Sequence, residues 1–187
     1  MKGSADLSGS DSFGANARAS QAATKKNFKN LKALDPNKRH LCCSLVEARA
    51  FVDFVNPRDD EHISIAISFL KERYHSKHVR AACEMSFGDT FVFEFEGEHG
   101  NSKFDSSLMI QLNQPLHLTI LRHRKNEKPV VIGTKNIDWR NLLSSNFIEV
   151  RPEIRPVDLT HQGSLGIIVL NLDLAPHMLK SELLGEE

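Results

Sequence analysis

Apolar and polar side chains alternate along much of the chain between residues 40 and 174. The alternation is clearest in HISIAISFL, residues 62–70, where Ile63, Ile65, Ile67 and Phe69 fall on one face. A period of two with β-branched or aromatic side chains is typical of a strand that buries one face. The same kind of pattern predicts strands over 40–48, 71–80, 90–96, 116–121, 129–139, 147–150 and 164–174.

The spacing of these segments predicts the fold class. Helical character is confined to short pieces such as 138–145, and no repeat of 20–50 residues is visible. About eight short strands separated by turns are typical of an antiparallel β-sandwich or barrel, so the chain is predicted to be all-β. Residues 1–33, rich in Ser, Gly, Ala and Asn, are expected to form a disordered arm before a domain over 34–176, with a short tail over 177–187.

Composition and charge narrow the functional classes. The 187 residues hold 24 basic and 24 acidic side chains, and this zero balance argues against a general nucleic-acid-binding protein. No apolar stretch reaches the roughly 20 residues that a membrane-spanning helix needs, and the first residues lack the apolar core of a secretory signal. We therefore expect a protein of the cytoplasm without a transmembrane segment.

Catalytic and metal-binding patterns are weak in this sequence. The cysteines are Cys42, Cys43 and Cys83, an odd number without CxxC spacing, and nine histidines are scattered along the chain. Zinc needs about four convergent ligands, and a cysteine nucleophile needs a partner base and an orienting group. We predict no enzyme activity, no metal and no cofactor, and we expect buried, reduced thiols rather than disulfides.

Several segments carry a family resemblance. EMSFGDTFVFEF (84–95), VVIGTKNIDWRNLL (130–143) and GIIVLNLDL (166–174) resemble strands of C2 domains. LDPNKRHL (34–41) and SSLMIQLNQPLHLTILR (106–122) resemble the C2 domain of the seventy-six-kilodalton centrosomal protein family, which is related to that of the coiled-coil and C2 domain ciliary transition-zone proteins. The resemblance implies an eight-stranded C2-like sandwich that serves as a scaffold at the centrosome, centriole, basal body or cilium and binds centriolar or ciliary proteins.

The resemblance also raises the question of calcium, which many C2 domains bind between two loops. Calcium requires several converging carboxylates, and residues 53–61 supply Asp53, Asp59, Asp60 and Glu61. The opposing loop, 122–128, reads RHRKNEK and is basic. Loops of opposite sign attract each other rather than a shared cation, so we expect these acids to be solvated or paired with the basic loop and the domain to work without calcium.

A basic segment provides the main candidate binding site. In some C2 domains the corresponding strand binds phosphoinositide headgroups, and anionic phospholipid is therefore an alternative ligand. The candidate residues are Lys71, Arg73, Lys77, Arg80, Arg122, Arg124 and Lys125. The alternative is a solvated outer strand whose charges protect a sheet edge from pairing. For Trp139, the one tryptophan, a core or capping role competes with a partner contact.

Overall fold

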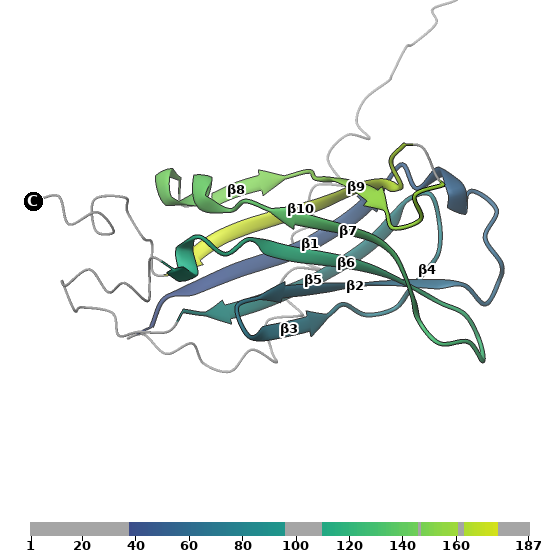
Figure 1. Ribbon diagram of the computed structural model, residues 1–187, viewed down its shortest axis with the longest axis horizontal. Helices are drawn as coiled ribbons and strands as arrows, with labels where there is room; N and C mark the ends of the chain where they lie inside the picture. Colours follow the sequence, from purple (N-terminus) through teal and green to yellow (C-terminus); the bar gives the residue numbers. More distant parts are fainter. Residues whose placement is uncertain (1–37, 96–109, 146, 161–162, 176–187) are drawn as a thin grey trace, which may run out of the picture. The chain divides into compact units, whose positions relative to one another are not determined.

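Ten antiparallel strands make up most of the described structure (Figure 1). The computed structural model describes residues 38–95, 110–145, 147–160 and 163–175. The strands are β1 His40–Arg49, β2 His62–Phe69, β3 Glu72–His75, β4 Val79–Arg80, β5 Met85–Glu94, β6 Leu116–His123, β7 Val130–Ile137, β8 Phe147–Val150, β9 Glu153–Pro156 and β10 Gly166–Ala175. Two short 3-10 helices, η2 Val52–Phe54 and η3 Arg140–Ser144, complete them. The predicted arm and tail lie outside the described residues.

The all-β, C2-like class is confirmed, and the number of strands exceeds the expected eight for two local reasons. The basic segment forms two strands, because Ser76 interrupts its ladder with β2. The Ser76 hydroxyl accepts a hydrogen bond from the Ile65 amide at 2.9 Å, and the Ser76 amide donates to the Ile65 carbonyl at 2.9 Å. The second addition is β9, which lies within the loop predicted before the last strand.

The strands form two layers that β9 connects. One layer holds β3, β4, β2, β6 and β7, and the other holds β8, β10, β1 and β5; β9 pairs with β7 and with β10. The strand β10 lies between β1 on one side and β8 and β9 on the other, as its nearly continuous apolar sequence predicts.

The sheet is closed at its ends by aromatic side chains. Strands β3 and β5 are the two ends of the hydrogen-bonded order. Tyr74 of β3 stacks on Phe91 of β5 with ring centroids 6.0 Å apart, and its ring lies 5.2 Å from that of Phe93. These rings cover the seam where the two ends approach each other, and such aromatic pairs stabilise beyond the area that they bury.

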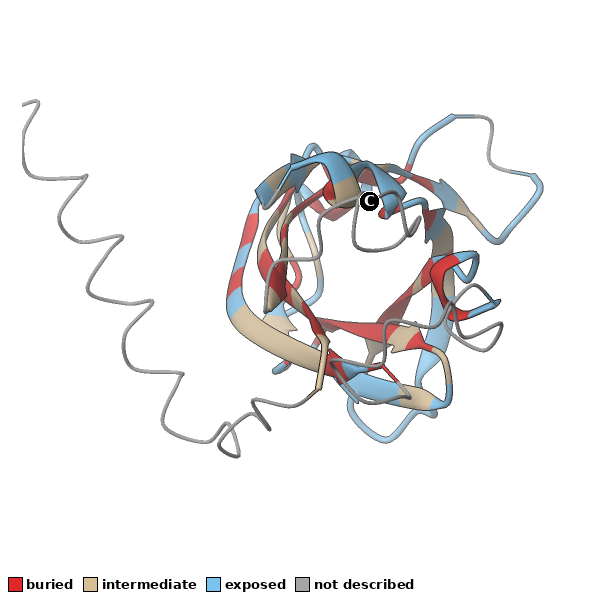
Figure 2. Ribbon diagram, turned by 90° about the vertical axis from the view of Figure 1, so that its left-hand side faces the viewer, coloured by how far each residue is buried: buried red, intermediate tan, exposed pale blue. Residues whose placement is uncertain are grey.

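The core lies between the two layers. The alternating residues of β2, Ile63, Ile65, Ile67 and Phe69, are at most 1% exposed, which confirms the predicted inward face. Figure 2 shows buried residues in bands along the strands, with exposed residues between them and in the connecting loops. Burying each such side chain contributes about 1.5–3 kcal/mol, so the inward face of these strands supplies most of the driving force for folding.

Two glycines allow close approach between elements. A Cβ atom on Gly133 would lie 2.6 Å from Cγ2 of Ile154, which explains a glycine inside β7 where β9 crosses it. Gly166 has a φ of 156°, and a Cβ atom there would overlap the buried ring of Phe51. Phe51 can therefore close this end of the core, just before η2.

Candidate functional site

A buried acid lies between two arginines where β2 begins and β6 ends. Glu61 immediately precedes β2 and is 4% exposed. Its Oε1 lies 3.1 Å from Nη2 of Arg124 and 3.5 Å from Nε of Arg122. Antiparallel pairing of β2 with β6 aligns His62 with His123 and thereby brings the acidic and basic loops together. The expected attraction between loops of opposite charge is thus present, and its centre is Glu61.

The other acids of the first loop are more exposed. Asp59 Oδ1 lies 2.6 Å from Nη2 of Arg80, and the two side chains are 97% and 64% exposed. An ion pair of that exposure contributes at most about 1 kcal/mol. Asp53 and Asp60 are also exposed. Among the residues that the structure describes, no group of three or more His, Cys, Asp or Glu side chains is arranged to hold a metal ion.

The seven basic candidates do not all share one environment. Arg80, Arg122 and Arg124 are engaged with carboxylates. The other four candidates are exposed: Lys71 after β2, Arg73 in β3, Lys77 before β4 and Lys125 after β6. Their part in ligand binding stays a prediction. The edge position of β3 agrees with a protective role for Arg73 and its neighbours, which is the alternative that the sequence left open.

A cluster of histidines lies beside the Glu61 ion pairs. The rings of His78 and His123 stack with their centroids 4.0 Å apart and 26° between their planes. Oγ of Ser64 lies 2.7 Å from Nε2 of His123, a hydrogen bond that holds this ring in place. The sequence showed these histidines as scattered. The pairing of β2 with β6 brings these histidines together, because its register sets His62 opposite His123.

Partial burial lowers the pKa of His123, and repulsion from His78, then His62 and His75, lowers it further. The four rings therefore interact electrostatically although they come from different segments. Ser64 is 0% exposed, so its hydroxyl serves to position His123 and is not accessible to a substrate.

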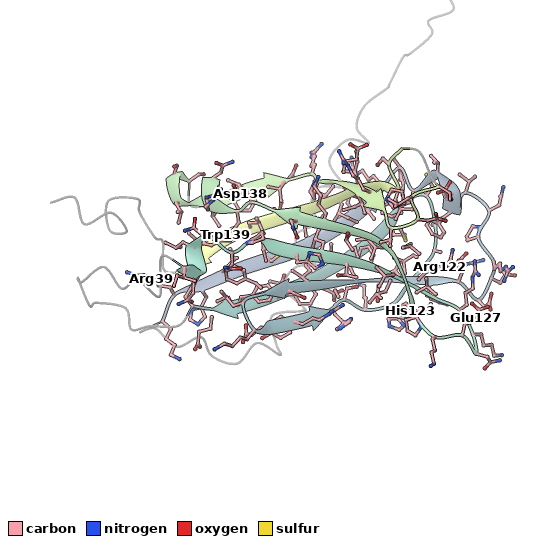
Figure 3. The ribbon with its side chains drawn as sticks, viewed as in Figure 1. Arg39, Arg122, His123, Glu127, Asp138 and Trp139 are labelled. Atoms are coloured by element: carbon pink, nitrogen blue, oxygen red, sulfur yellow. The ribbon has the colours of Figure 1, made fainter. Side chains whose placement is uncertain are left out.

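Trp139 closes the core at the opposite end of the strands from Arg122, His123 and Glu127 (Figure 3). Its ring is 0% exposed and lies 5.6 Å from that of Phe69 and 5.5 Å from that of Phe95. Its Nε1–H donates to the carbonyl of Gln114 at 2.8 Å. The structure thus supports the core role for Trp139.

Arg140 holds the turn that follows Trp139. Its Nη2 lies 2.6 Å from Oδ2 of Asp138, and the hydrogen bonds from its side chain and then its backbone amide lower the pKa of Asp138 to about 2. This carboxylate therefore stays ionised to a lower pH than an ordinary aspartate, and at neutral pH it accepts charge-assisted hydrogen bonds from Arg140.

The cysteines have the character of structural thiols. Burial, with a smaller effect of Asp173, raises the pKa of Cys42 to about 11. Burial, with a smaller effect of Cys42, raises the pKa of Cys43 to about 12. Both thiols are protonated at neutral pH and so are poor nucleophiles. Cys42, Cys43 and Cys83 are free thiols; Cys43 is buried as expected, whereas Cys42 and Cys83 are only partly buried.

The arrangement of strands defines a C2 domain. A solved structure described as "CC2D1B coordinates ESRCT-III activity during the mitotic reformation of the nuclear envelope" superposes with a TM-score of 0.58 at 12% identity, covering 75% of this chain and 55% of that one. A "C2 domain-containing protein from putative elicitor-responsive gene" superposes with a TM-score of 0.50 at 14% identity, covering 77% and 93%. At these identities the likeness concerns the fold.

No helix in the described part of the chain has the length and apolar character to span a bilayer.

Within that class, the chain belongs to the CEP76 C2 domain family, whose profile matches residues 32–180. The centrosomal protein of 76 kDa from Mus musculus is 23% identical over 165 residues, which cover 82% of this chain and 25% of the relative. The Homo sapiens protein is 23% identical over 154 residues, covering 76% and 23%. The family resemblance seen in the sequence is confirmed, and the chain spans about a quarter of the length of these relatives.

Proposed function

We propose that this chain provides a non-enzymatic C2 scaffold of the centrosome or cilium base that works through protein contacts and without calcium. The name of its relatives, centrosomal protein of 76 kDa, supports the location. The observation that carries the calcium-independent mechanism is the pairing of Glu61 with Arg122 and Arg124. The relatives are about three and a half times as long as this chain, so their remaining segments are expected to contribute further contacts.

The charges around Glu61 support a calcium-independent mechanism. Two guanidinium groups already lie within 3.5 Å of its carboxylate. A divalent cation that approached Glu61 would meet this positive charge at short range and would have to displace it. Calcium favours sites with several uncompensated carboxylates, and Asp59, two residues before Glu61, is paired with Arg80. The arginines fix the two loops relative to each other, a role that a bound cation would otherwise serve.

Other groups support a non-enzymatic role. The thiols of Cys42 and Cys43 are protonated, and the Ser64 hydroxyl that contacts His123 is buried in the sheet. Nucleophilic catalysis needs an activated group that a substrate can reach. Protonation of the two thiols and burial of the Ser64 hydroxyl disfavour these groups as nucleophiles, which favours binding as the activity of this domain.

A calcium-independent phosphoinositide-binding module is the second candidate. It is favoured by the exposure of Lys71, Arg73 and Lys77, which follow one another along the edge of the sheet. Basic residues near a membrane surface each contribute about 1 kcal/mol of attraction to anionic lipid. Neutralising these three residues should therefore abolish targeting if lipid is the anchor and leave it intact if protein contacts are.

We expect the full chain, fused to a fluorescent protein in cultured human cells, to be enriched at the centrosome. Because the anchor is a protein contact, the triple variant Lys71→Gln, Arg73→Gln, Lys77→Gln should be enriched to the same degree, also after intracellular calcium is chelated. The matched control replaces Lys128, Arg151 and Arg155, three exposed cations on other segments, by glutamine. Enrichment is measured as the ratio of centrosomal to cytoplasmic fluorescence.

Two outcomes would contradict the proposal. A diffuse wild-type signal would remove the centrosomal assignment for this domain. Loss of enrichment in the Lys71, Arg73 and Lys77 variant, with normal enrichment of the control, would favour the lipid candidate. Binding of phosphoinositide vesicles by the wild type but not by the same variant would support that second conclusion.

A further inference from the structure

Four histidines form one surface, which we call the histidine face. His62 begins β2, His75 ends β3, His78 precedes β4 and His123 ends β6. Two of them, His78 and His123, stack with centroids 4.0 Å apart. They are brought together by the fold alone, because they come from four separate segments.

The strand register explains why these side chains share the outer side of the sheet. His62 pairs with His123, and Ala66 of β2 pairs with His75. Residues 62, 64 and 66 of β2 point to the side opposite Ile63 and Ile65, which are buried in the core. In the structure, His75 and His78 are exposed, and His62 and His123 are partly buried. The face is therefore accessible to a ligand.

The charged groups around the histidine face are of two kinds, those engaged with a partner and those exposed to solvent. The charged side chains on the segments that carry this face or pair with it include Asp59, Asp60, Glu61, Glu72, Arg73, Lys77, Arg80, Asp89, Arg122 and Arg124. Arg80 is paired with Asp59, and Arg122 and Arg124 are paired with Glu61, whereas Arg73 and Lys77 are exposed. Asp89 accepts a hydrogen bond from the backbone amide of Lys77 at 3.1 Å, and the His62 ring lies 3.4 Å from the backbone oxygen of Asp60. Histidine is the side chain whose charge ordinarily changes between pH 5 and 8, so a change in the net charge of this face over that range depends on its histidines.

The ring of His123 gains a proton with difficulty in the absence of a ligand. Partial burial and then repulsion from the neighbouring histidines lower the pKa of His123 below the ordinary value of about 6.5. A bound anion would stabilise the protonated ring of His123 and raise its pKa again. An anion should accordingly bind more tightly as the pH falls, and its binding should be accompanied by proton uptake.

We propose that the histidine face docks an acidic segment of a partner protein, with Asp or Glu carboxylates accepting hydrogen bonds from His78, His123 and their neighbours, and that this docking strengthens at acidic pH. The proposal rests on the proposed function, since it names the chemistry of one protein contact. It adds a site, a partner chemistry and a pH dependence that the scaffold role does not require.

The local charges favour an acidic peptide over an anionic membrane. Membrane attraction sums over many uncompensated cations at once, whereas three of the cations on these segments, Arg80, Arg122 and Arg124, are already engaged. Histidine N–H groups donate directed hydrogen bonds, which a few carboxylates at defined spacing can accept.

The test uses the full chain and a fluorescein-labelled peptide of alternating Asp and Gly with six aspartates, measured by fluorescence anisotropy at pH 7.5 and 6.0. We expect the peptide to bind about tenfold more tightly at pH 6.0, as follows when on average about two-thirds of a proton is taken up on binding over this pH range. In the double variant His78→Gln, His123→Gln this ratio should fall below about twofold. Calorimetry in buffers of different ionisation enthalpy should show proton uptake by the wild type and not by the double variant.

His117→Gln is the matched control. His117 lies on the same strand as His123, but its Nδ1 is 2.6 Å from Oδ1 of Asn136 and it stands apart from the stacked pair. This variant should keep the tenfold ratio. Thermal unfolding of each variant at both pH values establishes that the chains compared are folded.

Three results would overturn the inference. The first is peptide affinity that does not change with pH, and the second is a pH dependence that survives in the double variant. The third is pH-dependent binding of phosphatidylserine vesicles, lost in the double variant, without binding of the peptide. In each case centrosomal enrichment of the wild type would leave the proposed scaffold role standing, whereas peptide binding without enrichment would uphold the site and contradict that role.

Discussion

Replacing Trp139 by alanine is expected to lower the free energy of unfolding by about 4 kcal/mol, the largest effect of any single substitution considered. The indole is 0% exposed, and its contacts with Phe69 and Phe95 would be replaced by a cavity. The carbonyl of Gln114 would also lose its hydrogen bond from Nε1. Urea denaturation followed by circular dichroism measures the loss.

Two further variants separate the contribution of the buried ring from that of the N–H group. Trp139→Phe keeps an aromatic ring but removes the N–H group, so it should cost about 2 kcal/mol. Phe147→Ala removes a ring that is 55% exposed and should cost less than about 1 kcal/mol. A loss below about 1 kcal/mol for Trp139→Ala would contradict the core role of Trp139. It would favour a partner contact for Trp139, which is the alternative that the sequence left open.

Replacing Glu61 by alanine is expected to destabilise the domain by about 3 kcal/mol, because it leaves two guanidinium groups close together without their shared carboxylate. Glu61 is 4% exposed, and Arg122 and Arg124 are held beside it at the ends of β2 and β6. Their side chains remain 29% and 22% exposed, so water relieves part of the penalty. The change is measured by urea denaturation at about 0.1 M salt.

Asp59→Ala is the matched control for Glu61→Ala. It removes an acid from the same loop and breaks the pair with Arg80, but that pair is exposed to solvent. We expect a loss below about 0.5 kcal/mol. Equal losses for the two variants would show that the burial of Glu61 is not what makes its ion pairs matter, and would contradict the role assigned to the arginines.

The sequence predicted the strands whose alternating pattern can be read from residues that are neighbours in the chain. β2 and β6 alternate apolar and polar residues, and the side chains of Ile63, Ile65 and Ile67 are buried as predicted. β9 was not predicted, because Ile154 is its one buried residue and its strand geometry comes from pairing with β7 and β10. Such pairing depends on residues distant in sequence, which a local period does not reveal.

The candidate site was predicted in part, for the same reason. Opposite charges on the loops 53–61 and 122–128 predicted their attraction, since sign alone decides it. Which acid would be buried, and that Arg122 and Arg124 would share it, depended on how β2 and β6 align. The stacking of His78 on His123 required the same alignment and was not anticipated.

The most direct test of the central claim, that arginines replace calcium between the loops, is a calcium titration of the isotope-labelled full chain followed by amide chemical shifts. The account predicts no saturable change at residues 53–61 or 122–128 up to about 5 mM calcium, beyond the range of the weakest calcium-binding modules. Saturable shifts in these loops with a Kd below about 1 mM would contradict it, because calcium would then compete successfully with Arg122 and Arg124 for the acids of the first loop.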